Sequence, residues 1–212
     1  MATMLRSSNQ RPLLSALTAL WLVSLAASGW QPYDRATWWM EVAPVLVALP
    51  VLWLSTSIFP LTSLALVLIA LHGLVLIVGG AYSYARVPIG FSVQEWFELS
   101  RNPYDRFGHF VQGFVPAIVL RELLIRLGTL TPGKLLAGLV LACCLAVSAA
   151  YELIEFAAAM LLGQGADEFL GSQGDVWDSQ WDMLMCLVGA VVSLLSLTRL
   201  HNRQLQALRG AR

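Results

Sequence analysis

Residues 171–183 read GSQGDVWDSQWDM and lead directly into an apolar run over residues 183–197. Within this stretch Asp175, Asp178 and Asp182 are three and four positions apart. On a helix that spacing places all three carboxylates on one face. Carboxylates at the mouth of a membrane span are costly unless something pairs with them. The stretch therefore predicts a membrane-spanning helix with a polar site at its beginning.

The composition of the chain favours an integral membrane protein. Of its 212 residues 58% are hydrophobic and 12% are charged, and the mean hydropathy is +0.69. Soluble domains carry about 25% charged residues. The basic residues are few and scattered, which argues against a nucleic-acid partner. The cysteines Cys143, Cys144 and Cys186 lie in apolar runs, and we expect them to be buried and unpaired.

Six apolar runs are long enough to cross a bilayer. They predict an all-α, polytopic membrane helix bundle of about six transmembrane helices, with residues 1–212 as a single membrane domain. The first run also fits a signal peptide, and we favour a retained helix because the run is long and ends at Trp30. The expected spans are residues 13–30, 42–58, 61–81, 107–127, 134–162 and 179–199.

The longest polar segment, residues 82–106, separates the third span from the fourth. Ser92 and Glu95 have the spacing of a capping box. This spacing predicts a short interfacial helix near residues 93–100 that lies at the membrane surface. Asn102-Pro103 is expected to end it.

The distribution of basic residues predicts the orientation. Six spans place both termini on one side, and loops on the cytoplasmic side carry an excess of Lys and Arg. With the N-terminus inside, the cytoplasmic side holds nine of the thirteen basic residues. We therefore expect a multi-pass membrane protein with both termini cytoplasmic. The nine are Arg6, Arg11, Arg121, Arg126, Lys134, Arg199, Arg203, Arg209 and Arg212, and the remaining four are Arg35, Arg86, Arg101 and Arg106.

Acid and imidazole groups gather at the extracytoplasmic ends of the last three spans. Asp105 and His109 are four residues apart at the start of the fourth span, and Glu152 and Glu155 are three apart in the fifth. Because these spans are consecutive, their ends can meet in one pocket. The candidate catalytic residues are Asp105, His109, Glu152, Glu155, Asp178 and Asp182; the candidate metal ligands are His109, Glu152, Glu155, Asp175, Asp178 and Asp182; the candidate substrate-binding residues are Arg101, Arg106, Gln173 and Gln180.

Six carboxylates cannot all stay ionised close together at low dielectric without cations. A divalent metal is one resolution, since His with several carboxylates suits Zn, Mn, Mg or Ca. Neutralisation by Arg101 and Arg106, with some carboxyls protonated, is a second. In a third, the groups point into water and never converge.

These resolutions lead to three functional hypotheses. A bound metal lowers the pKa of water and clamps phosphoryl oxygens, which at a bilayer surface suits hydrolysis of a lipid or envelope-precursor phosphate. Alternatively, the protein is a non-catalytic transporter or envelope accessory protein whose carboxylates bind a ligand. In the third hypothesis the carboxylates form a purely structural charge network.

Four long runs carry a resemblance to a known family. They are GGAYSYARVPIG (79–90), RNPYDRFGHFVQGFVPA (101–117), SAAYELIEF (148–156) and LGSQGDVWDSQWDM (170–183). The chain resembles the YjdF-type bacterial inner-membrane family over about residues 30–201. The resemblance implies a polytopic inner-membrane protein of a bacterium and no particular activity.

A weaker resemblance in layout is to VanZ-like membrane proteins, which are linked to glycopeptide resistance and the cell envelope. Asp105, Arg106, His109 and Phe110 are similar to their acidic–basic pair followed by HF; Glu155 and Asp182 match the acids of two later spans. The chain departs from the pattern after Glu155, where Phe156 replaces a Gln, and in the last span, where Cys186 and Gly189 replace an Asn–Gly order. The resemblance implies a shared layout rather than a shared activity.

Overall fold

The computed structural model describes residues 2–128, 130–162 and 172–209. These residues form seven helices and no strand, and six of the helices are long and apolar enough to cross a membrane. The expected all-α bundle of six spans is confirmed. The helices are α1 (Ala2–Trp30), α2 (Arg35–Ser55), α3 (Ser63–Tyr82), α4 (Pro88–Trp96), α5 (Tyr104–Arg126), α6 (Lys134–Leu162) and α8 (Asp178–Arg209).

The beginning of α2 lies before its expected position. The helix begins at Arg35 instead of residue 42, because Asp34 caps it: the Asp34 side chain accepts a hydrogen bond of 2.7 Å from the Thr37 backbone N–H. Pro44 lies inside α2 without ending it. The earlier beginning brings Glu41 into the helix.

The other spans keep their expected positions with shifted ends. α5 begins at Tyr104 instead of residue 107, so that Asp105 and His109 lie on the same helix. α8 continues to Arg209 instead of ending at residue 199. Its 32 residues correspond to about 48 Å at ~1.5 Å per residue, which exceeds a hydrocarbon core of about 30 Å.

The prediction of a capped helix over residues 93–100 is wrong in its bounds. α4 begins at Pro88 and ends at Trp96, so Ser92 lies inside the helix and cannot cap it. Proline at the first helical position has its φ already fixed near the helical value and lacks an N–H that would be unpaired there. The local preference of Pro88 therefore outweighs the capping box.

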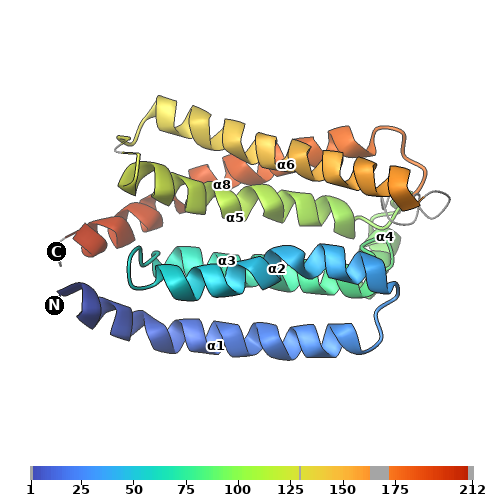
Figure 1. Cartoon of the computed structure of the whole chain (residues 1–212). Helices are drawn as coiled ribbons and strands as arrows, with labels where there is room; N and C mark the ends of the chain where they lie inside the picture. The colour runs from blue at the N-terminus through green and yellow to red at the C-terminus, as the bar shows by residue number, and fades with distance from the viewer. Residues whose placement is uncertain (1, 129, 163–171, 210–212) are drawn as a thin grey trace.

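The helices pack as two groups that contact each other: α5, α6 and α8 form one group, and α1, α2 and α3 form the other (Figure 1). α5 and α8 make the most extensive contact in the molecule, and α6 packs against both; α1 and α2 pack against α3, which contacts α5. The chain enters α1 and leaves α8 at one end of the bundle, while α4 lies at the opposite end (Figure 1). We call this opposite end, where α5 and α8 begin, the site end, and the other the termini end.

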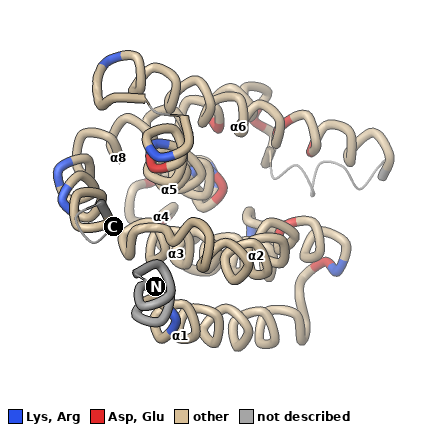
Figure 2. Tube along the Cα trace, turned by 60° about the vertical axis from the view of Figure 1, so that its left-hand side comes forward, with Lys and Arg blue, Asp and Glu red and all other residues tan. Residues whose placement is uncertain are grey.

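Small residues bring α5 and α8 to backbone contact. A Cβ on Gly113 would overlap the backbone carbonyl of Cys186, and a Cβ on Gly189 would overlap that of Phe110. Glycine at both crossings therefore permits the close approach, as small residues do between membrane helices. In Figure 2 most of the length of the helices is tan, the colour of residues other than Lys, Arg, Asp and Glu.

Candidate functional site

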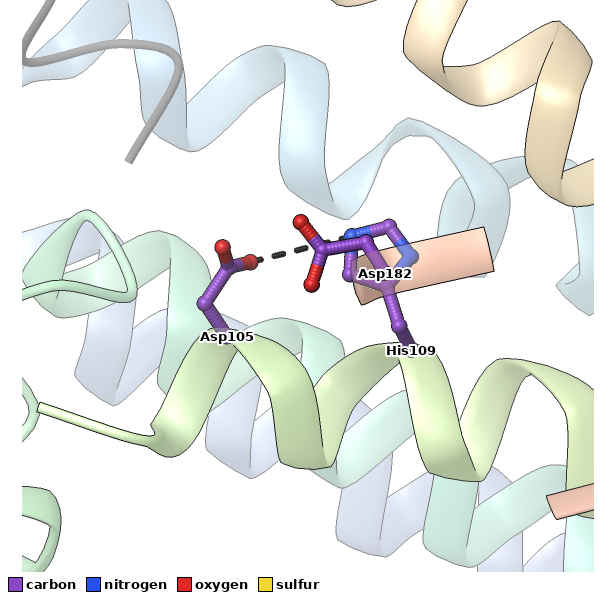
Figure 3. Close-up of side chains that lie close together, drawn as sticks. All are labelled: Asp105, His109 and Asp182. Atoms are coloured by element: carbon purple, nitrogen blue, oxygen red, sulfur yellow. Dashed lines mark ion pairs between the residues drawn. The ribbon is translucent and has the colours of Figure 1, made fainter. Parts of the chain in front are cut away.

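Three buried side chains converge at the site end. Asp105 and His109 come from the first two turns of α5, four residues apart, and Asp182 comes from the first turns of α8 (Figure 3). One ligand atom from each lies within 4.8 Å of the others. The side chains are 7%, 6% and 2% exposed, respectively. We call Asp105, His109 and Asp182 the carboxylate–histidine cluster.

The hydrogen bond of His109 determines which ring nitrogen faces the cluster. Its Nδ1 lies 2.9 Å from Oε1 of Gln112, an oxygen that can only accept, so Nδ1 carries the proton. In the neutral ring Nε2 then presents a lone pair. Nε2 lies 3.8 Å from Asp105 and 3.6 Å from Oε1 of Glu152 on α6. Three side chains from α5 and α8 therefore bring ligand atoms together, and Glu152 of α6 lies beside His109.

Two acceptor atoms, one in the cluster and one beside it, have no hydrogen-bond donor among the described residues. Oδ1 of Asp182 and Oε1 of Glu152 are both buried and have no hydrogen-bond partner among the described residues. A buried acceptor without a donor costs roughly 1–3 kcal/mol, and more if charged. A cation bound to the Asp182 oxygen and to Nε2 of His109 would remove that cost at Asp182.

Both arginines of the site are ion-paired. Arg101 pairs with Asp178 and lies 3.4 Å from Asp105, and Arg106 lies 2.5 Å from Asp175. The two arginines thus neutralise part of the acidic charge, which is the second of the resolutions considered from the sequence. The two arginines pair with Asp178 and Asp175. Only Arg101 also contacts the carboxylate–histidine cluster, through Asp105.

Three further residues predicted for the site, Glu155, Gln173 and Gln180, lie outside the cluster. Glu155 lines a cavity together with Asp105 and His109. Gln173 forms two hydrogen bonds of 3.0 Å with the backbone of Asn102, so it holds the loop before α5. Gln180 is exposed, and its position on α8 turns it away from Asp182.

The sequence analysis missed two residues of this end, Glu41 and Tyr84. Both line the cavity, whose volume is about 30 Å³. Glu41 accepts a hydrogen bond of 3.1 Å from the Tyr151 hydroxyl on α6. Burial raises the pKa of Tyr84 well above its ordinary value, and the Glu41 carboxyl adds to the shift, so Tyr84 stays protonated. The one signal for Glu41 was an acid directly before the expected second span, residues 42–58. The cavity lining is Glu41, Leu76, Tyr84, Asp105, Gly108, His109, Gln112, Tyr151 and Glu155.

A second buried polar cluster, also missed as a whole, lies at the termini end. Glu122 and Arg126 of α5 form an ion pair at 2.5 Å. His201 of α8 joins it: its Nε2 lies 3.1 Å from Glu122, and its Nδ1 lies 2.9 Å from Arg121. All potential hydrogen-bonding side-chain atoms of Glu122 have partners, in contrast to the site end.

These observations define a class of protein, a multi-pass membrane helix bundle with a buried carboxylate–histidine cluster at one end. Residues 13–203 match the family described as "Predicted membrane protein (DUF2238)". The chain is 50% identical to the inner membrane protein YjdF of Escherichia coli (strain K12) over 197 residues, which cover 92% of this chain and 94% of that protein. The chain belongs to this family. No solved structure matches it.

Proposed function

We propose that the carboxylate–histidine cluster binds a divalent cation, and that the protein uses this cation to hydrolyse a phosphate ester of a membrane lipid or lipid-linked envelope precursor. The observation that carries the proposal is the buried Oδ1 of Asp182, which has no donor among the described residues and belongs to a group of ligand atoms within 4.8 Å of one another. An imidazole with carboxylates suits Zn, Mn or Mg.

The number of ligands supports a catalytic cation over a purely structural one. Asp105, His109 and Asp182 supply three protein ligands, and Glu152 lies close enough to hold a bound water. Catalytic zinc sites keep three protein ligands and leave a position for water or substrate. A cation in such a site generates hydroxide near neutral pH and polarises a phosphoryl oxygen.

The orientation we propose places the site end outside the cell and both termini in the cytoplasm. Among the residues whose side chains the structure describes, six Lys or Arg lie toward the termini end and four toward the site end, and an excess of basic residues marks the cytoplasmic side. The similarity to an inner membrane protein supports a bacterial inner membrane as the location. The substrate phosphate would then be in the outer leaflet. The six are Arg11, Arg121, Arg126, Lys134, Arg199 and Arg203; the four are Arg35, Arg86, Arg101 and Arg106.

The first test is elemental analysis of the full chain purified in detergent after loading with Zn, Mn or Mg. We expect about one divalent ion per chain in the wild type. The ion should be lost in His109→Ala and Asp182→Asn, because each removes a ligand atom of the cluster. Glu95→Gln is the matched control, since Glu95 is exposed on α4.

The second test is phosphate release from phosphatidic acid in mixed micelles, and from a polyprenyl phosphate, by the loaded protein. We expect release by the wild type and the Glu95→Gln control, and none by Asp182→Asn. Wild-type protein that takes up no ion from any of the three metals would contradict the cation site. An ion without phosphate release from either lipid would contradict the hydrolase.

One observation favours a second candidate function, a non-catalytic transporter or envelope accessory protein. Arg101 and Arg106 pair with Asp178 and Asp175, so an incoming phosphate would have to displace a carboxylate from them. In this case a transported solute or a lipid would raise the thermal unfolding midpoint of metal-free protein, and Asp182→Asn would remove that increase.

A further inference from the structure

Glu41 is a buried acid that reaches the site from the opposite group of helices. It lies on α2, is 5% exposed, and accepts the hydrogen bond of Tyr151. Gly80 of α3 makes room for it, because a Cβ at that glycine would lie 3.0 Å from the Cβ of Glu41. Glu41 is not among the residues whose ligand atoms converge in the cluster. Its carboxyl is therefore available for a role other than metal binding.

Tyr84, which lines the cavity together with Glu41, has a strained backbone conformation. Ser83 and Tyr84 both have left-handed φ angles, 51° and 47°, although neither is glycine. Non-glycine residues in this region cost of order 1–3 kcal/mol each and cluster at functional sites. Gly79 and Gly108 flank the Tyr84 ring, since a Cβ at either would overlap it. Strain and three glycines thus shape this side of the cavity.

The cavity connects Glu41 with the carboxylate–histidine cluster. Its volume of about 30 Å³ exceeds the roughly 10–15 Å³ that one water molecule needs. Glu41 and Tyr84 line the same cavity as Asp105 and His109. The ionisable groups that face it from the packed helices are Glu41 of α2, Tyr84, Asp105 and His109 of α5, and Tyr151 and Glu155 of α6.

We propose that Glu41 is the proton acceptor of the site, the group that takes a proton from water in this cavity when the nucleophile forms. This inference rests on the proposed hydrolysis. As the water oxygen bonds to phosphorus, its proton passes to a carboxylate oxygen of Glu41. The ester bond breaks, and the same proton then neutralises the leaving oxygen, so that one water and one ester yield an alcohol and inorganic phosphate. Tyr151 positions the carboxylate, because its hydroxyl donates to one of the two oxygens.

The test compares Glu41→Gln, Glu41→Asp and the control Glu95→Gln in the full detergent-purified chain. Elemental analysis measures bound Zn²⁺, micellar phosphatidic acid measures hydrolysis, and infrared difference spectra before and after Zn²⁺ addition detect a newly protonated carboxyl group. We expect Glu41→Gln to keep its ion, to lose the protonated-carboxyl band, and to hydrolyse about 100- to 10,000-fold more slowly, the usual contribution of acid–base catalysis. Glu41→Asp should keep the band and recover part of the rate.

The readouts separate this inference from the proposed function. A band that persists in Glu41→Gln, or that is missing from wild-type protein, would overturn the role of Glu41. Loss of the ion in Glu41→Gln would overturn it as well, because Glu41 would then be a ligand. If wild-type protein binds Zn²⁺ and shows a Glu41-dependent band but releases no phosphate, the hydrolase fails while the proton acceptor stands.

Discussion

Glu122 shows how this chain holds a charge inside the bundle. The residue has no exposed surface, yet its carboxylate accepts from the Thr62 backbone and hydroxyl and from Arg126. Since Arg121 can only donate, His201 accepts through Nδ1 and so carries its proton on Nε2, which donates to Glu122. One tautomer of His201 satisfies both neighbours.

At the residue scale, we predict that Glu122→Gln destabilises the protein by about 3–5 kcal/mol, because it leaves Arg126 without its buried countercharge. The measurement is thermal or denaturant unfolding in detergent. Glu95→Gln, an exposed acid on α4, should change stability by less than about 0.5 kcal/mol. Equal stabilities of the two variants would show that the Glu122 cluster contributes nothing to folding.

At the scale of elements, the contact between α5 and α8 determines the geometry of the cluster, because Asp105 and His109 lie on one helix and Asp182 on the other. We predict that Gly113→Ala separates these helices, since its Cβ would overlap the Cys186 carbonyl. Unfolding should occur at lower temperature, and bound cation should fall with it.

Gly138→Ala is the matched control for that substitution. Gly138 also lies inside a helix, but nothing lies within 4 Å of a Cβ added there. Alanine should be neutral or stabilise α6 by about 0.5–1 kcal/mol, the ordinary gain over glycine in a helix. If Gly113→Ala behaved like Gly138→Ala, the close contact between α5 and α8 would not be required.

The sequence predicted the spans well because long apolar runs have few alternative structures, and α6 has the expected bounds, Lys134–Leu162. It also predicted the acids of the cluster, since helical spacing and consecutive spans bring them together. Glu41 could not be placed, because its position depends on the Asp34 cap and on where α2 meets α6. His201 was missed for a similar reason: its partner Arg121 is 80 residues away in the chain.

At the scale of the whole molecule, the beginning of α1 and the end of α8 lie at one end, and the carboxylate–histidine cluster lies at the other (Figure 1). We predict that a membrane-impermeant maleimide labels Glu98→Cys in intact spheroplasts, and labels Thr131→Cys only after lysis. Both positions are exposed, at the site end and the termini end respectively. The measurement is the mass shift of the labelled chain.

Background labelling in this experiment should be low, because Cys144 and Cys186 are buried and Cys143 is half-buried inside the membrane-spanning helix α6. The reverse pattern, with Thr131→Cys labelled in intact cells, would place the cluster on the cytoplasmic side. It would leave the outer leaflet without access to the cluster.

The long C-terminal part of α8 has a consequence for how the protein is made. Gln204 accepts the Leu64 backbone N–H at 2.9 Å, an early donor of α3, and His201 completes the surroundings of Glu122. His201 follows Glu122 by 79 residues, and Gln204 follows Leu64 by 140 residues. During synthesis α3 and α5 therefore enter the membrane before their last polar partners exist, and the nascent protein carries a buried acid with an incomplete set of donors until the end of α8 has been made. A chain cut short before residue 201 would present that acid to the proteases that remove unfinished membrane proteins.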